Sequence, residues 1–293
     1  MTDLTASRRT TAPAVSAAKG GDTPLVMVTA YDAPTARIAD GAGVDMILVG
    51  DSVAMVVLGY EDTLQVTTAD LAHHVGAVAR TRPGALVVAD LPWMSYHVGA
   101  DDAVRNAATL VRAGAGAVKL EGGRKRLAAV QAILDAEIPV MGHLGLTPQS
   151  VHAFGGFRVQ GRDLDAARAI VDDAIALAEI GCFAIVLECV PDAVARLVTD
   201  SVAVPTIGIG AGRHCDGQVL VFHDLVGLET RVTPKFVRRY ADLAGDATAA
   251  VARFAADVRA GRFPSSDETY HAADAIADAL RLYGGSPAEH ASA

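Results

Sequence analysis

The chain has 293 residues, 51% of them hydrophobic and 20% charged, which is enough to bury a large core in one α/β domain or two small ones. Its net charge is −9 and no long run of Lys and Arg stands out, which disfavours a nucleic-acid partner. Gly, Asp, Pro or Thr interrupts each apolar run before it reaches the roughly 18 residues of a membrane span, so no membrane partner is expected either.

The beginning of the chain shows no regular pattern. Residues 1–22 are rich in Ala, Thr and Ser, and the pair Arg8-Arg9 is not followed by the apolar segment of an export signal. We predict a disordered N-terminal tail over 1–22, one catalytic domain over 23–285 and a flexible C-terminal tail over 286–293. The three cysteines are an odd and sparse set, which argues against a disulfide framework and favours a cytoplasmic location.

Short apolar runs alternate with helical patterns from Pro24 onward. The runs are rich in Val, Ile and Leu and nearly continuous, as strands buried on both faces are. They predict eight strands, at 24–31, 45–51, 85–91, 117–122, 138–144, 183–189, 205–210 and 218–222.

Most segments between these runs carry the signals of helices. Those at 67–81 and 101–113 open with Thr or Asp residues typical of helix N-termini, and Gly114 and Gly181 stand just past helix ends. A longer helical pattern covers 162–180. Two further helices are predicted after the last strand, at 235–260 and 268–282.

Eight β-then-α units over roughly 200 to 250 residues are typical of a closed parallel barrel. We therefore predict the α/β class and a (β/α)8 TIM barrel, formed by a single domain with extra C-terminal helices. An open doubly wound sheet is the main structural alternative.

Ionisable side chains stand within or at the ends of five of these strands. In such barrels the chemistry is carried out at the C-terminal ends of the strands, so these side chains should meet at one rim. Burying so many of them without partners would be costly, and their convergence indicates a functional site. The candidates are Asp51 with its neighbour Ser52, Asp90, Lys119, Glu121, His143 and Glu188.

Asp51, Asp90 and Glu121 come from three adjacent strands. Carboxylate oxygens without thiolates suit a hard cation, so the set predicts a Mg²⁺ site, with Mn²⁺ or Co²⁺ as substitutes. Structural alternatives stand beside this prediction. Asp51 alone is equally explained as a helix cap, and Lys119 with Glu121 as an internal ion pair. His143 has the alternative of a core histidine with satisfied hydrogen bonds.

Long stretches of the chain are similar to the ketopantoate hydroxymethyltransferase family, with a likeness that is nearly continuous from Pro24 to Tyr270. The residues 1–22 have no counterpart that can be assigned. The similar stretches are MVTAYDAPTARIADGAGVDMILVGDS (27–52), VADLPWMSY (88–96), AVKLEGG (117–123), GHLGLTPQSV with GGFRVQGR (142–162), IGIGAGRHCDGQVLVFHDLVGL (207–228), PKFVRRYA (234–241) and FPSSDETYH (263–271).

The resemblance implies transfer of a hydroxymethyl group from 5,10-methylenetetrahydrofolate to 3-methyl-2-oxobutanoate. The product, 2-dehydropantoate, is an intermediate in the synthesis of pantothenate, the coenzyme A precursor. The resemblance also implies one Mg²⁺ per subunit that stabilises an enolate, folate as co-substrate, and a homo-oligomer, which in the family is often a decamer.

The same resemblance implies a role for each candidate residue. Glu188 looks like the general base, while Asp51, Asp90 and Glu121 look like the metal ligands. The residues that look like contacts to the oxo acid or lie near it are Asp51, Ser52, Asp90, Lys119 and His143.

The nearest alternative function is another metal-dependent barrel enzyme that acts on oxo acids, of the aldolase or phosphoenolpyruvate mutase/isocitrate lyase type. The stretches GLTPQSV, GGFRVQGR and CDGQVLV favour the hydroxymethyltransferase. A catalytically inactive barrel kept as a scaffold would have lost a metal ligand or the base, and none is lost here.

Overall fold

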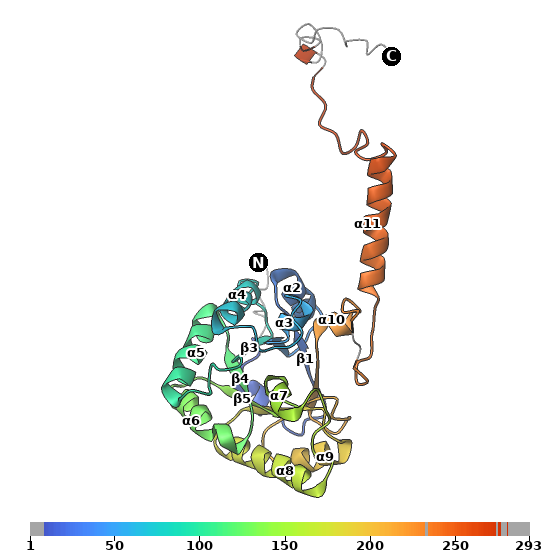
Figure 1. Ribbon diagram of the computed structural model, residues 1–293. Helices are drawn as coiled ribbons and strands as arrows, with labels where there is room; N and C mark the ends of the chain where they lie inside the picture. Colours follow the sequence, from blue (N-terminus) through green and yellow to red (C-terminus); the bar gives the residue numbers. More distant parts are fainter. Residues whose placement is uncertain (1–8, 232–233, 274, 277–279, 281–293) are drawn as a thin grey trace. The chain divides into compact units, whose positions relative to one another are not determined.

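The computed structural model describes residues 9–231, 234–273, 275–276 and 280 (Figure 1). The chain divides into two compact units, Met1–Ala241 and Asp242–Ala293. The expectation of one domain over 23–285 is therefore replaced by a division before Asp242, and the barrel belongs to the first unit.

Eight parallel strands close into a barrel in chain order, which confirms the predicted fold and excludes the open doubly wound sheet. The ring closes because β8 pairs with β1, with Gly217 beside Leu25. Each strand falls on one of the predicted apolar runs. The strands are β1 (Leu25–Thr29), β2 (Met46–Val49), β3 (Leu86–Asp90), β4 (Ala117–Glu121), β5 (Val140–Gly145), β6 (Ala184–Glu188), β7 (Thr206–Ile209) and β8 (Gly217–Leu220).

Helices surround the barrel, and Figure 1 shows α4, α5, α6, α8 and α9 following one another around the strands. The predicted end signals act as expected: Thr67 and Asp70 form a reciprocal cap at the start of α4, and Gly114 ends α5 with a φ of 118°. The helices of this unit after β1 are α2 (Ala33–Gly41), α3 (Val53–Val56), α4 (Thr68–Ala79), α5 (Ala100–Ala113), α6 (Leu127–Asp135), α7 (Val151–Phe154), α8 (Leu164–Glu179), α9 (Asp192–Ser201) and α10 (Phe222–Leu225).

Successive side chains of each strand face opposite layers of the core. In β2, Met46 and Leu48 belong to the cluster inside the barrel, whereas Ile47 and Val49 pack with the helices. The same alternation in the later strands decides which polar side chains can reach the barrel's interior end.

A short helix, α1 (Ala12–Ser16), packs on the cluster inside the barrel, so the prediction of a disordered tail over 1–22 is wrong for residues 9–22. Ala12 and Val15 are buried there. The segment also forms an ion pair with the residue that precedes β8, because Lys19 Nζ lies 3.0 Å from Asp216 Oδ2. Residues 1–8 lie outside the described residues.

The second unit contains α11 (Leu243–Arg259), in which no residue is buried. This helix begins later than the predicted 235, because Asp242 caps it by accepting a hydrogen bond from the Gly245 N–H at 3.2 Å. The predicted helix at 268–282 is wrong for 268–273, which are not helical, and the rest of it lies partly outside the described residues. The predicted C-terminal tail lies wholly outside them. Within the described residues, no helix has the length and apolarity needed to cross a membrane.

Candidate active site

The candidate residues predicted at the strand ends come together at the C-terminal ends of β2 to β6. Asp90, Lys119, Glu121, His143 and Glu188 lie an even number of positions from interior-facing residues of their own strands, so they face the barrel mouth. Strand register sets them side by side: Asp90 pairs with Lys119, and Glu121 with His143.

Asp51 and Ser52 follow β2 directly. Gly50, which precedes them, has no room for a side chain, since a Cβ there would lie 2.9 Å from Ser52 Oγ and 3.2 Å from Asp90 Oδ2. The Ser52 hydroxyl also lies 2.8 Å from the Tyr31 hydroxyl. The helix-cap alternative for Asp51 does not apply, because α3 begins after Ser52 and the Asp51 side chain instead accepts from Gln149.

Lys119 is paired with Asp90, at 2.8 Å between Nζ and Oδ1, and both side chains are buried. This pairing differs from the internal Lys119–Glu121 ion pair considered from the sequence. Burial lowers the pKa of Lys119, but the nearby carboxylates of Asp90, Glu121 and Asp51 raise it by more than burial lowers it. The net shift of the pKa is upward, so the ammonium stays charged.

His143 links the carboxylates of two strands. Its Nδ1 lies 3.5 Å from Glu121 Oε1 and 3.2 Å from Lys119 Nζ, and its Nε2 lies 3.2 Å from Glu188 Oε2. Burial and the Lys119 charge lower the pKa of His143, whereas contacts with Glu121 and Glu188 raise it to about 9. His143 is therefore part of the polar cluster rather than an isolated core histidine.

The three carboxylates Asp51, Asp90 and Glu121 are buried together. Burial raises the pKa of Asp51 well above its usual value, and the negative charges of Asp90 and Glu121 raise it further. Oδ1 of Asp90, which faces Lys119, has no aligned hydrogen bond. Hard oxygen donors that repel one another in a buried site fit a divalent cation.

The carboxylates do not by themselves complete a metal cage. Among the residues that the structure describes, no group of three or more His, Cys, Asp or Glu side chains is arranged to hold an ion. A cation at this place would therefore take oxygen ligands from a substrate or from water as well.

Two residues of the cluster, Gln149 and Tyr96, were not predicted from the sequence. Gln149 donates to Asp51 Oδ2 at 2.8 Å and Tyr96 donates to Gln149 Oε1 at 2.6 Å. Both come from loops after β5 and β3, and both lie in stretches that carry the family resemblance. That resemblance was the only signal that could have marked them.

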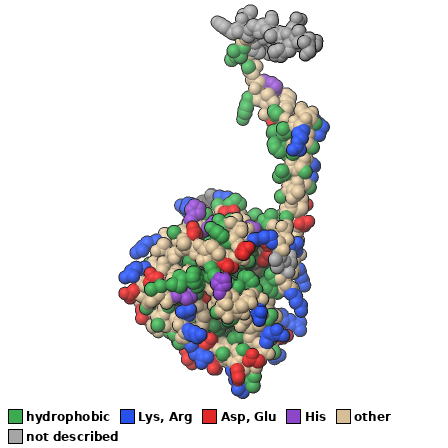
Figure 2. All heavy atoms as spheres, in the orientation of Figure 1, with side chains coloured by type: hydrophobic (Ala, Val, Ile, Leu, Met, Phe, Trp, Pro, Cys, Tyr) green, Lys and Arg blue, Asp and Glu red, His purple; other side chains and the backbone are tan. Residues whose placement is uncertain are grey.

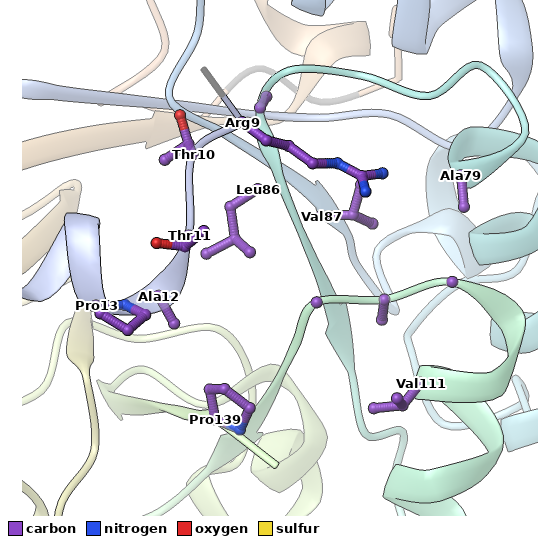
Figure 3. Close-up of a pocket in the computed structure, with 14 residues that line it drawn as sticks. Arg9, Thr10, Thr11, Ala12, Pro13, Ala79, Leu86, Val87, Val111 and Pro139 are labelled. Carbon is purple, nitrogen blue, oxygen red and sulfur yellow. The ribbon is translucent and has the colours of Figure 1, made fainter. Parts of the chain in front are cut away.

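A pocket of about 580 Å³ lies at the other ends of the strands (Figure 3). Arg9 and Thr11 of the N-terminal segment line it together with Leu86, the first residue of β3, and Pro139, which precedes β5. None of the predicted site residues lines this pocket, so it is separate from the polar cluster.

Comparison with known proteins places the chain among relatives that are similar over nearly their whole length. Residues 9–266 match the family model described as ketopantoate hydroxymethyltransferase. A protein of Bradyrhizobium diazoefficiens named 3-methyl-2-oxobutanoate hydroxymethyltransferase 2 is 54% identical over 272 residues, which cover 93% of each chain. A 3-methyl-2-oxobutanoate hydroxymethyltransferase of Pyrobaculum calidifontis is 56% identical over 247 residues, covering 84% of this chain and 93% of that one.

Solved structures of similar fold are more distant in sequence. Phosphoenolpyruvate phosphomutase from Streptomyces platensis superposes with a TM-score of 0.56 at 16% identity, over 93% of this chain and 96% of that one. Phosphonopyruvate hydrolase in complex with oxalate and Mg²⁺ gives a TM-score of 0.57 at 15% identity, over 93% and 95%. At this level of identity the likeness shows the shared fold.

Proposed function

The chain belongs to the ketopantoate hydroxymethyltransferase family, and we propose that the buried cluster at the ends of β2 to β6 is where its reaction takes place. The enzyme adds a hydroxymethyl group to 3-methyl-2-oxobutanoate and so serves pantothenate synthesis. The observation that carries the proposed location is the convergence of Asp51, Asp90, Glu121, His143 and Glu188 at the mouth of the barrel, where this fold places its chemistry.

Asp51, Asp90 and Glu121 would hold one Mg²⁺ per subunit, together with oxygens of the substrate and water. When bound, the ion would supply positive charge beside the 2-oxo and carboxylate oxygens of the substrate, where negative charge develops as C3 loses its proton. The mutual repulsion of the buried carboxylates supports this assignment, since a cation relieves it.

Lys119 and Ser52 would bind the oxo acid beside that ion. The Lys119 ammonium is fixed by Asp90 and carries a second positive charge to the same oxygens. The Ser52 hydroxyl, held by Tyr31, is the neutral hydrogen-bonding group of the site.

Glu188 would be the general base that removes the proton from C3. Its side chain is 16% exposed, against 3% for that of Glu121 and 4% for that of Asp90, so of these three carboxylates it is the most open to a bound substrate. His143 Nε2, 3.2 Å from Glu188 Oε2, would hold the carboxylate in one orientation while its other oxygen takes the proton. His143 would thus act near the substrate through Glu188.

The one-carbon unit would come from 5,10-methylenetetrahydrofolate. An oxo acid cannot gain a hydroxymethyl group without a donor at the oxidation level of formaldehyde. The folate would supply the CH₂ unit that bonds to C3, water would supply the hydroxyl oxygen, and tetrahydrofolate would leave. The protein's contribution is to place that donor next to C3.

The alternative of a phosphoenolpyruvate mutase or isocitrate lyase activity is not favoured. Phosphoenolpyruvate phosphomutase and 2,3-dimethylmalate lyase share the fold at 16–17% identity, whereas the named hydroxymethyltransferases are 53–58% identical to this chain. A catalytically inactive scaffold is likewise disfavoured, because each candidate residue is present and in place.

The second unit supports a homo-oligomer. One face of α11 carries apolar side chains three to four positions apart, those of Val251, Phe254 and Val258. They are 66%, 53% and 46% exposed. Figure 2 shows hydrophobic side chains along this part of the chain. Such a face is typical of a contact with another subunit. The decamer expected from the family, and a cytoplasmic location in keeping with three unpaired cysteines, belong to the same proposal.

Product formation tests the proposed function. The purified protein should form 2-dehydropantoate from 3-methyl-2-oxobutanoate only when methylenetetrahydrofolate and a divalent metal are both present. Equal turnover of phosphonopyruvate or of a cleavable hydroxy acid would favour the alternative activity instead.

A further inference from the structure

Gln149 reaches three strand ends at once. It lies on the turn Pro148–Ser150 between β5 and α7 and is buried. Its side-chain Nε2 donates to Asp51 Oδ2 at 2.8 Å and to the Leu91 carbonyl at 3.0 Å, and its backbone N–H donates to Glu121 Oε2 at 3.0 Å. One residue therefore contacts the ends of β2, β3 and β4.

The orientation of the Gln149 amide follows from its partners. The Leu91 carbonyl can only accept a hydrogen bond, so the NH₂ group must face it and Oε1 must face the other way. Oε1 then accepts from the Tyr96 hydroxyl at 2.6 Å, and the Tyr96 oxygen accepts from the Glu121 N–H at 3.2 Å. Both hydrogens of the Gln149 side-chain amide are donated, and the Tyr96 hydroxyl both donates and accepts. The hydrogen bonds of this network can therefore run in one direction only.

This network fixes one oxygen of each of two carboxylates. Asp51 Oδ2 and Glu121 Oε2 are both held by Gln149. Asp90 Oδ2 is held in turn by the Asp51 N–H at 3.0 Å. Of the other oxygens, Asp90 Oδ1 lies 2.8 Å from Lys119 Nζ and Glu121 Oε1 lies 3.5 Å from His143 Nδ1.

We propose that Gln149, locked by Tyr96, is a positioning residue that sets Asp51 and Glu121 for binding a divalent cation. The proposal rests on the metal role given to these carboxylates above. Partners that orient metal ligands typically change metal affinity when they are removed, although they touch neither the metal nor the reacting atoms.

Two substitutions separate this role from general packing. Gln149→Leu keeps a similar volume but leaves Asp51 Oδ2, the Leu91 carbonyl and the Tyr96 hydroxyl without their partner. Tyr96→Phe keeps Gln149 but removes the donor that locks its amide. Gln131→Leu is the matched control, because Gln131 Nε2 donates to Asp135 Oδ1 at 2.7 Å on the outer surface of α6.

Binding of Mn²⁺ to the full-length protein, followed by electron paramagnetic resonance, tests the proposal without relying on turnover. The unaltered protein and Gln131→Leu should bind alike, while Gln149→Leu should bind about 10- to 100-fold more weakly and Tyr96→Phe about tenfold more weakly.

Two results would overturn the proposal in distinguishable ways. Unchanged Mn²⁺ affinity in both Tyr96→Phe and Gln149→Leu, each shown to be folded by circular dichroism, would refute the positioning role alone. A lack of Mn²⁺ binding by the unaltered protein would refute the metal site itself and the positioning role with it.

Discussion

Asp90 and Lys119 form a buried ion pair across neighbouring strands, with Oδ1 and Nζ 2.8 Å apart and each side chain only 4% exposed. A buried pair of this kind gives little net stability. Removing one partner is nevertheless costly, because the other charge is then buried without an opposite charge beside it. The pair therefore links the site to the stability of the barrel.

Asp90→Ala should lower the free energy of unfolding by about 3–5 kcal/mol, because Lys119 would remain as a buried cation without its carboxylate. The double variant Asp90→Ala/Lys119→Met should recover most of that loss. Urea unfolding of both variants measures the difference, and equal destabilisation in the two would contradict the ion-pair explanation. Both should lose affinity for the oxo acid, which isothermal titration with 3-methyl-2-oxobutanoate would measure.

Glu188→Gln should slow exchange of the C3 hydrogen of 3-methyl-2-oxobutanoate with deuterated solvent by about 10²- to 10⁴-fold, since the amide cannot accept the proton. Proton NMR of the substrate in D₂O follows this exchange without any folate. Glu179→Gln, at the exposed end of α8, is the control and should exchange at the normal rate. Normal exchange in the Glu188 variant would show that another group is the base.

Removing divalent metal with EDTA should abolish both turnover and C3 exchange, and Mg²⁺ or Mn²⁺ should restore them. The reason is that Asp51, Asp90 and Glu121 would then face one another with no metal ion beside Lys119 and His143 to offset their charge. Metal content measured before and after treatment completes the test. Full activity in protein with no detectable metal would rule out the metal role.

Asp216→Asn should destabilise the protein at neutral pH by about 2 kcal/mol, through its loss of charged hydrogen bonds. Burial raises the pKa of Asp216, but hydrogen bonds from Thr206, Lys19 and Gly20 lower it by more than burial raises it. The net shift of the pKa is therefore downward. A group whose folded pKa is depressed stabilises the fold above its unfolded pKa, near 3.9, and that contribution fades as the pH falls below it.

The gap in stability between the unaltered protein and Asp216→Asn should therefore be full at pH 7 and should shrink below about pH 4. Thermal unfolding across this range measures it. A gap that stays constant down to pH 3 would mean that the carboxylate's charge is not what stabilises the N-terminal segment.

Phe254→Glu should reduce self-association, because it places a charge on the apolar face of α11; its ring contact with Phe263, at 5.1 Å between centroids, is lost as well. Light scattering should report a smaller particle with the same circular dichroism. Ala249→Glu provides the matched control, since Ala249 is exposed and, two positions before Val251, lies on another face of the helix. An unchanged particle mass in the Phe254 variant would show that the subunit contact is formed by another surface.

The barrel and most of its site were predictable because both depend on local regularities. Each apolar run marked a strand, and the alternation of faces along a strand placed Lys119 and Glu121 on the same side. Gln149 and Tyr96 were not predicted because they stand on loops, and no periodic pattern in the sequence describes the path of a loop.

The N-terminal helix escaped for another reason. Only Ala12 and Val15 of α1 are buried, and their partners are strands far along the chain, so the segment's composition resembles that of a tail. Long-range packing of so few side chains leaves no local pattern in the sequence.

That helix helps to fill one end of the barrel. Ala12 and Val15 pack in the same buried cluster as Met27, Met46 and Met141, and the polar candidates stand at the opposite ends of the strands. If the oxo acid binds among the carboxylates, as proposed, and the larger folate binds outside it, the oxo acid would arrive before the folate and leave, as product, after it. Steady-state kinetics should accordingly follow an ordered sequence, in which a dead-end analogue of the oxo acid competes with the first substrate and not with the second.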